Sequence, residues 1–129
     1  MTFRYFEVTP KIIRPIIPVI LKSSTKVMLY SALIDSGADY CIFSIDTAKV
    51  LSIKLYLKDK VKFIGVGEEK VTGFLSNIEI KTGDKFIKTK VIFANISDFG
   101  HGILGQQGFF DHYDVKLSYR KRTIEIVKQ

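Results

Sequence analysis

Short runs of β-branched and apolar residues, separated by turn-forming residues, are the feature that most limits the fold of this 129-residue chain. The runs IIPVIL and KVMLYSALI flank the polar stretch KSST and therefore predict a β-hairpin. Two further runs lie on either side of a glycine-containing bend at residues 65–69, and KTGDK supplies a turn before FIKTKVIFA. The last run, YDVKLSYRKRTIEIV, alternates apolar and polar residues on both sides of a basic turn. Many short strands with frequent turns predict an all-β sheet or barrel.

Helical signals in the sequence are few and short. Ser44 can cap a helix formed by IDTAKVL, and QQGFFDHY after Gly105 can form one or two helical turns, with Phe109 and Phe110 as its anchors in the core. The chain has no repeat and no linker-like tract. We therefore expect a single domain over residues 1–129.

The charge of the chain bears on its partners. The formal net charge is +7, and a basic balance can indicate nucleic acid or a membrane surface as a partner. The lysines are spread along the sequence, however, and only residues 120–122 (RKR) form a cluster, which is most simply a solvated turn. The apolar run at residues 12–21 is too short to span a bilayer and contains a charge and two prolines. We therefore expect neither a nucleic-acid partner nor a membrane partner.

Two features point to a cytoplasmic location. Cys41 is the single cysteine and cannot form an internal disulfide, which suits a reducing compartment. The N-terminal segment MTFRYFEVTPK has neither the apolar core nor the cleavage site of a signal peptide. Cys41 is expected to be a small buried residue, because neither His101 nor His112 is arranged with it as a catalytic base would be. The two histidines and the nearby aspartates match no standard metal-site spacing, so no metal is expected.

The segment ALIDSGADYCIFS, residues 32–44, places an aspartate directly after an apolar run. Gly37 permits a tight bend that brings backbone N–H groups close to the Asp35 carboxylate, and Ser36 supplies a short hydroxyl group. A partly buried carboxylate that is held by donors can have its pKa tuned for catalysis. Taken alone, however, Asp-Ser-Gly is more often an ordinary Asx-turn.

Two later elements make the motif more specific. Asp35-Ser36-Gly37-Ala38 is followed by the glycine-containing hairpin at residues 64–74 and then by Ile103-Leu104-Gly105, which precedes QQGFFDHYDV. This order resembles the retropepsin family, the dimeric aspartic proteases of retroviruses and their cellular relatives, over about residues 14–126. The last element looks particularly like the bacterial and archaeal members. The resemblance implies an all-β, retropepsin-like acid protease half-barrel with a flap hairpin and one or two short helices.

The resemblance also implies a mechanism. Because the chain contains one Asp-Ser-Gly, the active form would be a homodimer to which each subunit contributes one Asp35. Two such carboxylates share one proton, so that one activates a water and the other hydrogen-bonds to the peptide carbonyl. The expected activity is that of an aspartic-type endopeptidase, a hydrolase acting on a peptide or protein substrate without a metal or cofactor. The alternative is a catalytically weak, retropepsin-fold dimeric module that binds peptides.

Individual residues take roles from the same resemblance. Support of the active site is expected from Ser36, Gly37, Ala38 and Gly105. Contact with the substrate is expected from Leu33, Asp39, Tyr40, Ile64, Gly65, Val66, Gly67 and Ile103. Many family members carry an arginine after the Ile-Leu-Gly element that pairs with the residue matching Asp39, but this chain has Gln106 there. Arg14 is the remaining candidate and would reach Asp39 of a second subunit; otherwise Asp39 is a surface or Asx-turn carboxylate.

Overall fold

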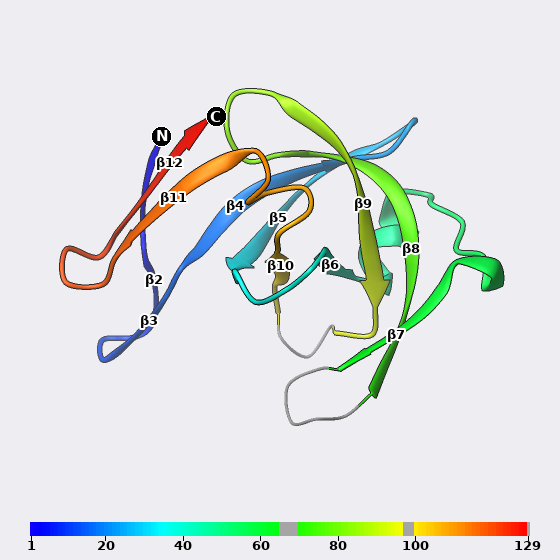
Figure 1. Ribbon diagram of the computed structural model, residues 1–129, viewed down its shortest axis with the longest axis horizontal. Coiled ribbons are helices and arrows are strands. Elements are labelled where there is room, and N and C mark those ends of the chain that lie inside the picture. The colour runs from blue at the N-terminus through cyan, green and yellow to red at the C-terminus, as the bar shows by residue number, and fades with distance from the viewer. Residues whose placement is uncertain (65–69, 97–99, 129) are drawn as a thin grey trace.

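The computed structural model describes residues 1–64, 70–96 and 100–128 and consists mainly of β-strands. The strands are β1 (Thr2–Arg4), β2 (Phe6–Thr9), β3 (Ile12–Arg14), β4 (Ile16–Lys22), β5 (Val27–Ile34), β6 (Cys41–Ser44), β7 (Lys60–Ile64), β8 (Lys70–Lys81), β9 (Phe86–Ala94), β10 (Gly102–Leu104), β11 (Tyr113–Ser118) and β12 (Thr123–Lys128). The helices are α1 (Ile45–Val50) and the short 3₁₀ helix η1 (Leu57–Asp59) (Figure 1).

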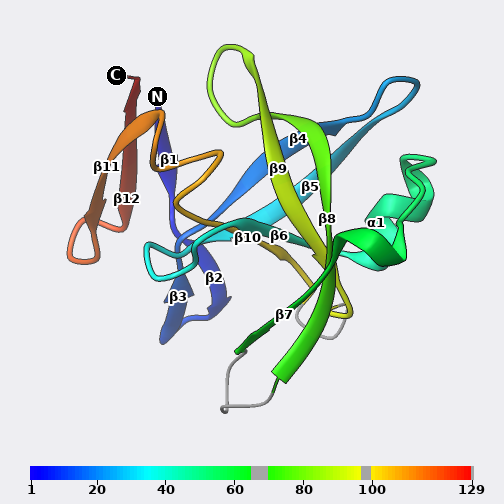
Figure 2. The same ribbon diagram turned by 45° about the vertical axis from the view of Figure 1, so that its right-hand side comes forward.

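Seven strands form one curved sheet in the order β4-β5-β10-β6-β9-β8-β7. The sheet closes because the end of the long strand β8 also pairs with β4, in the register Leu21↔Ile80. Six strands therefore surround an interior, and β7 continues the sheet beyond β8 (Figures 1 and 2). The expected all-β architecture is confirmed.

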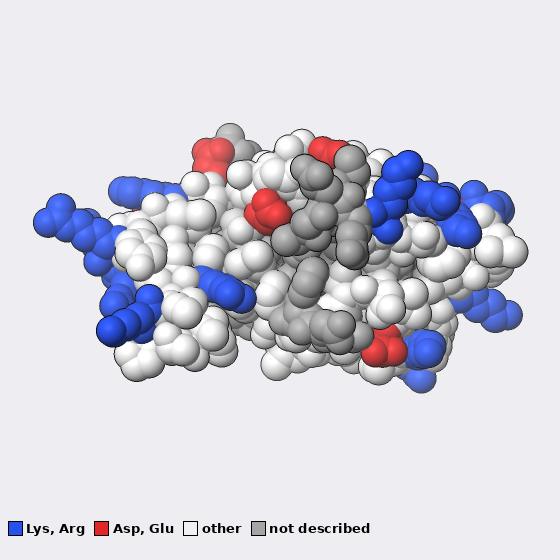
Figure 3. Space-filling model, turned by 90° about the horizontal axis from the view of Figure 1, so that it is seen from below, with Lys and Arg blue, Asp and Glu red and all other residues white. Residues whose placement is uncertain are grey.

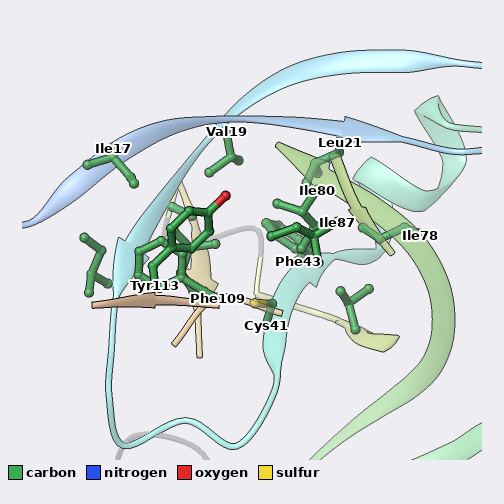
Figure 4. Packing of buried hydrophobic residues seen from close by; sticks show 14 of the residues in the cluster. Ile17, Val19, Leu21, Cys41, Phe43, Ile78, Ile80, Ile87, Phe109 and Tyr113 are labelled. Atoms are coloured by element: carbon green, nitrogen blue, oxygen red, sulfur yellow. The ribbon is translucent and has the colours of Figure 1, made fainter. Parts of the chain in front are cut away.

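The seven-stranded sheet is called the half-barrel below. Its interior is filled with aliphatic and aromatic side chains (Figure 4). In β4, Ile17, Val19 and Leu21 are buried whereas Pro18 is exposed, which is the period of two expected of a strand with one face in a core. Burial of each such side chain contributes about 1.5–3 kcal/mol. The largest fully buried side chains from other parts of the chain are Phe43, Phe93 and Phe109.

The hairpin predicted from KSST is formed by β4 and β5, which pair antiparallel in the register Val19↔Tyr30. Ser23 closes its turn: the Ser23 hydroxyl accepts a hydrogen bond from the Lys26 N–H at 3.1 Å and donates one to the Leu51 carbonyl at 2.8 Å. The second contact ties the hairpin to the residue that ends α1. The predicted hairpins β8–β9 and β11–β12 are likewise present.

One of the two expected helices is regular. Ser44 caps α1, and its side-chain oxygen accepts a hydrogen bond from the Thr47 N–H at 3.3 Å. Residues 106–112, where one or two helical turns were expected, form consecutive turns rather than a regular helix, and the Tyr113 N–H donates to the Phe109 carbonyl at 3.1 Å across one of them. Gly108 has a φ of +98°, outside the helical region, and its N–H donates to the Asp111 carboxylate at 3.0 Å.

The N-terminal segment folds into strands that the sequence pattern does not predict. β1 pairs with β12 in a three-stranded sheet of order β1-β12-β11, called the terminal sheet below, and Met1 lies beside the C-terminal half of β12, where it bonds to Ile126 (Figure 1). β2 and β3 form a separate two-stranded sheet. None of the helices in the described part of the chain has the length and apolar character that a membrane crossing requires.

Candidate active site

Asp35 lies directly after β5, where the chain turns away from the sheet. Its backbone N–H donates to the Leu104 carbonyl of β10 at 3.0 Å, which fixes the start of the turn. Its carboxylate Oδ1 accepts a hydrogen bond from the Gly37 N–H at 2.9 Å, and the Ala38 N–H donates to the Asp35 carbonyl at 3.2 Å. The side chain is half-buried. The carboxylate is therefore held in one orientation on a tight loop while part of it stays accessible.

The loop at residues 35–40 packs against the segment that follows β10. β10 lies between β5 and β6, parallel to the first and antiparallel to the second, so this loop crosses its end (Figure 2). Gly105 comes next and has no space for a side chain: a Cβ atom there would stand 2.6 Å from the Ala38 carbonyl oxygen and closer still to that of Tyr40. The structure thus brings Gly105 against the Asp35 loop.

Gln106 attaches the loop to the same segment with its side chain. Its amide Nε2 donates to the Ser36 carbonyl at 3.0 Å, and its backbone N–H donates to the Ala38 carbonyl at 2.8 Å. The Gln107 N–H donates to the Asp39 carbonyl at 3.0 Å and extends this ladder. Sequence reasoning identified Gln106 only as the residue that stands in place of an arginine. Its contact with Ser36 depends on how the two segments meet in space.

Asp39 and Arg14 are both exposed. Among the ion pairs formed within the described residues, none involves Asp39. Arg14 ends β3, next to Pro15, whose carbonyl accepts a hydrogen bond from the Ile34 N–H at 2.9 Å. A pair between Arg14 and Asp39 of a second subunit remains a prediction.

Several residues expected to contact a substrate lie together beside the loop. Tyr40 and Ile103 are half-buried and pack with a second apolar cluster, to which the β7–β8 hairpin contributes Val61, Phe63 and Val71. Leu33 is half-buried and is the register neighbour of Ile103. Ile64 ends β7 and pairs with Lys70. Three predicted flap residues lie outside the described residues: Gly65, Val66 and Gly67.

A hollow of about 420 Å³ opens beside Asp35. Its wall is apolar apart from the Asp35 loop, and its lining residues are Ile34, Asp35, Ser36, Phe110, Val115 and Leu117. Phe109 is fully buried, and Phe110 packs against the same core, as expected of both; Phe110 is half-buried and also faces this hollow. The alternation of Val115 and Leu117 with polar residues predicted their strand correctly. It gave no sign that this apolar face borders the Asp35 loop.

Cys41 lies beneath the site and is fully buried. Its Sγ accepts a hydrogen bond from the Gly105 N–H at 3.4 Å and donates one to the Gln107 carbonyl at 3.3 Å. Burial raises the pKa of the Cys41 thiol to about 12. A neutral thiol of this kind is a weak nucleophile, so Cys41 is a packing residue beneath the loop, as expected.

Charged side chains are unevenly distributed on the face in Figure 3. Lys and Arg gather towards the two ends of the molecule in this view, and separate Asp and Glu side chains stand among uncharged residues between them. A nucleic-acid groove needs cations along its length. On the described surface of this face the cations do not form a continuous track.

The chain was compared with known proteins. No protein-family model and no curated protein matches the sequence. Among solved structures, the EIAV protease in complex with an inhibitor is 24% identical, with a TM-score of 0.57 over 78% of this chain and 86% of its own. A retropepsin-like aspartic protease from Rickettsia conorii is 13% identical, with a TM-score of 0.56 over 87% of this chain and 89% of its own. The likeness at these identities concerns the fold, and the chain therefore has an all-β, retropepsin-like fold.

Proposed function

We propose that this protein is an aspartic endopeptidase that acts as a homodimer, with one Asp35 from each subunit. The observation that carries the proposal is the Asp35 loop itself. Its carboxylate is held by the Gly37 N–H, its backbone is bonded to β10, and it borders an open hollow whose remaining wall is apolar. The likeness of the fold to two proteases supports the proposal.

The dimer follows from the chemistry. Hydrolysis of a peptide needs a base to activate water and an acid to polarise the carbonyl, and one Asp35 cannot hold both protonation states at once. A two-fold axis beside Asp35 would bring in the second carboxylate. The apolar wall that Phe110, Val115 and Leu117 give to the hollow suits a face covered by another subunit.

The paired carboxylates would work as one unit. At a separation of about 3 Å they share a proton, because both cannot ionise at low cost. The ionised carboxylate takes a proton from water as the water oxygen attacks the carbonyl carbon. The protonated carboxyl hydrogen-bonds to the carbonyl oxygen as negative charge develops there. Transfer of a proton to the leaving nitrogen then completes the cleavage into an acid and an amine.

Other residues receive roles within the same proposal. Ser36, Gly37, Ala38 and Gly105 would hold the loop, and Leu33, Tyr40 and Ile103 would line pockets for substrate side chains. Asp39 would lie at the end of the cleft and pair with Arg14 of the second subunit. The proposal takes residues 1–129 as one domain and places the protein in the cytoplasm.

The decisive experiment compares the wild type with Asp35→Asn on a peptide library, while sedimentation records the oligomeric state. We expect cleavage products from the wild type, none from Asp35→Asn, and dimers of both, because Asn is nearly the same size but cannot act as a base. Cleavage by Asp35→Asn at the wild-type rate would refute the role of Asp35. A wild type that binds peptides without cleaving them would identify the alternative, a peptide-binding module.

A further inference from the structure

The β2–β3 hairpin exposes an unusual amount of apolar surface. Phe6, Val8 and Ile12 are 54%, 45% and 47% exposed, although the two strands together comprise only seven residues. The turn itself is well formed, since the Ile12 N–H donates to the Thr9 hydroxyl oxygen at 3.1 Å. An isolated two-stranded hairpin is at best marginally stable in water, and clustered apolar side chains on a surface mark an interaction site.

Both ends of this hairpin are attached beside the hollow at Asp35. On one side, Pro15 accepts the hydrogen bond from Ile34, a lining residue of the hollow. On the other side, the Tyr5 N–H donates to the Arg122 carbonyl at 3.0 Å, and the Tyr5 ring meets that of Tyr119 edge-on at 6.3 Å. Arg122 and Tyr119 belong to the turn between β11 and β12, the hairpin that lines the hollow through Leu117.

A third contact joins the hairpin to the β11–β12 turn. The Arg122 guanidinium bonds to the Glu7 carboxylate at 3.3 Å and so links β2 to the β11–β12 turn. Figures 1 and 2 both show the hairpin extending away from the half-barrel beside that turn. The hairpin thus projects outward from the edge of the Asp35 face.

We propose that the β2–β3 hairpin is a dimerisation arm whose side chains Phe6, Val8 and Ile12 pack on the second copy of this chain. The inference rests on the proposed homodimer. A copy that places its own Asp35 next to this one must cover the hollow and therefore comes to lie beside the base of the arm. By two-fold symmetry each subunit then holds the other with its arm.

The size of the hollow supports the same occupant. Six residues line it, whereas a stable interface uses about 20–30 residues on each side. A second subunit that covers the hollow must therefore also contact surface outside it. The arm begins beside the hollow, where Pro15 bonds to Ile34, and supplies additional exposed apolar side chains.

Sedimentation of the full chain over a range of concentrations tests the arm. The test variant is Phe6→Ser/Ile12→Ser, and the matched control is Val27→Ser/Leu29→Ser, whose side chains are at least as exposed but belong to the β4–β5 hairpin. We expect the dimer dissociation constant of the test variant to rise about 100-fold, because each substitution acts twice in a two-fold dimer. The control is expected to stay within about twofold of the wild type. Circular dichroism checks that both variants are folded.

A second measurement does not depend on shortening the side chains of the arm. A photo-crosslinking residue in place of Val8 should join two subunits covalently, and the same residue in place of Leu29 should not. Equal dissociation constants for wild type and test variant, together with no crosslink from position 8, would overturn the arm and leave the dimer intact. A wild type that stays monomeric at all concentrations would overturn both. A dimer that needs the arm but cleaves no peptide would retain the arm and refute the proposed activity.

Discussion

At the scale of single residues, Gln106 fixes the carbonyl that follows Asp35. Its amide supplies a neutral donor to Ser36, so it can hold the loop without adding a charge beside Asp35, whose carboxylate would share a proton in the proposed dimer. An arginine here would lower the pKa of a nearby carboxylate through its permanent charge. The neutral side chain is compatible with the proposed catalytic pair, and it gives Asp39 no cationic neighbour at this position.

Gln106→Ala should lower kcat more than it raises KM. The Ser36 contact is exposed, so its loss costs at most about 1 kcal/mol of stability. A displaced loop would move Asp35 relative to the second Asp35 of the proposed dimer, however, and a shift of about 1 Å can cost about 100-fold in rate. Steady-state kinetics over a range of pH, with melting temperatures, would measure both effects. Gln107→Ala is the matched control, because Gln107 bonds to Asp39 and Cys41, within the described part of the chain, through its backbone N–H and carbonyl. Equal kcat values for both variants would refute a positioning role.

At the scale of secondary-structure elements, the terminal sheet (β1-β12-β11) has one face that borders the hollow and one that does not. On β11 the side chain of Leu117 lies on the face that lines the hollow, opposite Ile124 of β12. Val127 is three residues after Ile124, and side chains alternate between the faces along a strand. Val127, which pairs with Asp114, therefore lies on the opposite face from Leu117 and Ile124. Leu117 and Val127 are both about half exposed. Substitutions of these two residues therefore compare an exposed apolar position beside the hollow with one on the opposite face of the same sheet.

Leu117→Asp should dissociate the proposed dimer, whereas Val127→Asp should not. A carboxylate at position 117 would have to lose its hydration when a second subunit covers the hollow, and burial of an unpaired charge is costly. Size-exclusion chromatography with light scattering would report the molecular mass of each variant. If Leu117→Asp remained dimeric at micromolar concentration, this face of β11 would not be part of the interface.

The elements that sequence predicted well are those that local chemistry determines. The turns at Ser23 and at residues 82–85 lie between β-branched runs, and Ser44 is a strong N-cap, so hairpins and helix could be placed. The sequence pattern did not predict β2, because no residue of this strand is buried and its apolar residues Phe6 and Val8 therefore do not mark a core-facing side. The segment after Gly105 forms turns rather than a regular helix because Gly108 has a positive φ, which a continuous helix does not allow.

The site was predictable only in part, for a related reason. The order of Asp35, the β7–β8 hairpin and Gly105 can be read along the chain, and the structure brings Gly105 against the Asp35 loop. The bond from Gln106 to Ser36 joins residues 70 positions apart. The hollow combines Asp35 with Leu117 from another sheet. Contacts of this range follow from the tertiary fold and leave no pattern in either segment alone.

At the scale of the whole molecule, the half-barrel and the terminal sheet meet at the Asp35 loop. The half-barrel fixes the loop through β10, and the terminal sheet supplies one wall of the hollow. Neither part alone forms a complete proposed active site, because the second carboxylate must come from another copy. Activity should therefore follow the concentration of dimers rather than of chains.

Subunit mixing tests this dependence directly. If wild type and Asp35→Asn are combined in equal amounts and allowed to exchange, about half of the wild-type subunits enter mixed dimers. A mixed dimer has one carboxylate and cannot both activate water and polarise the carbonyl, so activity per wild-type subunit should fall to about half and decrease further as the variant is added in excess. Asp35→Asn/Leu117→Asp is the control, because a variant that cannot associate should leave the activity unchanged. Activity that is insensitive to Asp35→Asn at any ratio would mean that one subunit suffices for cleavage.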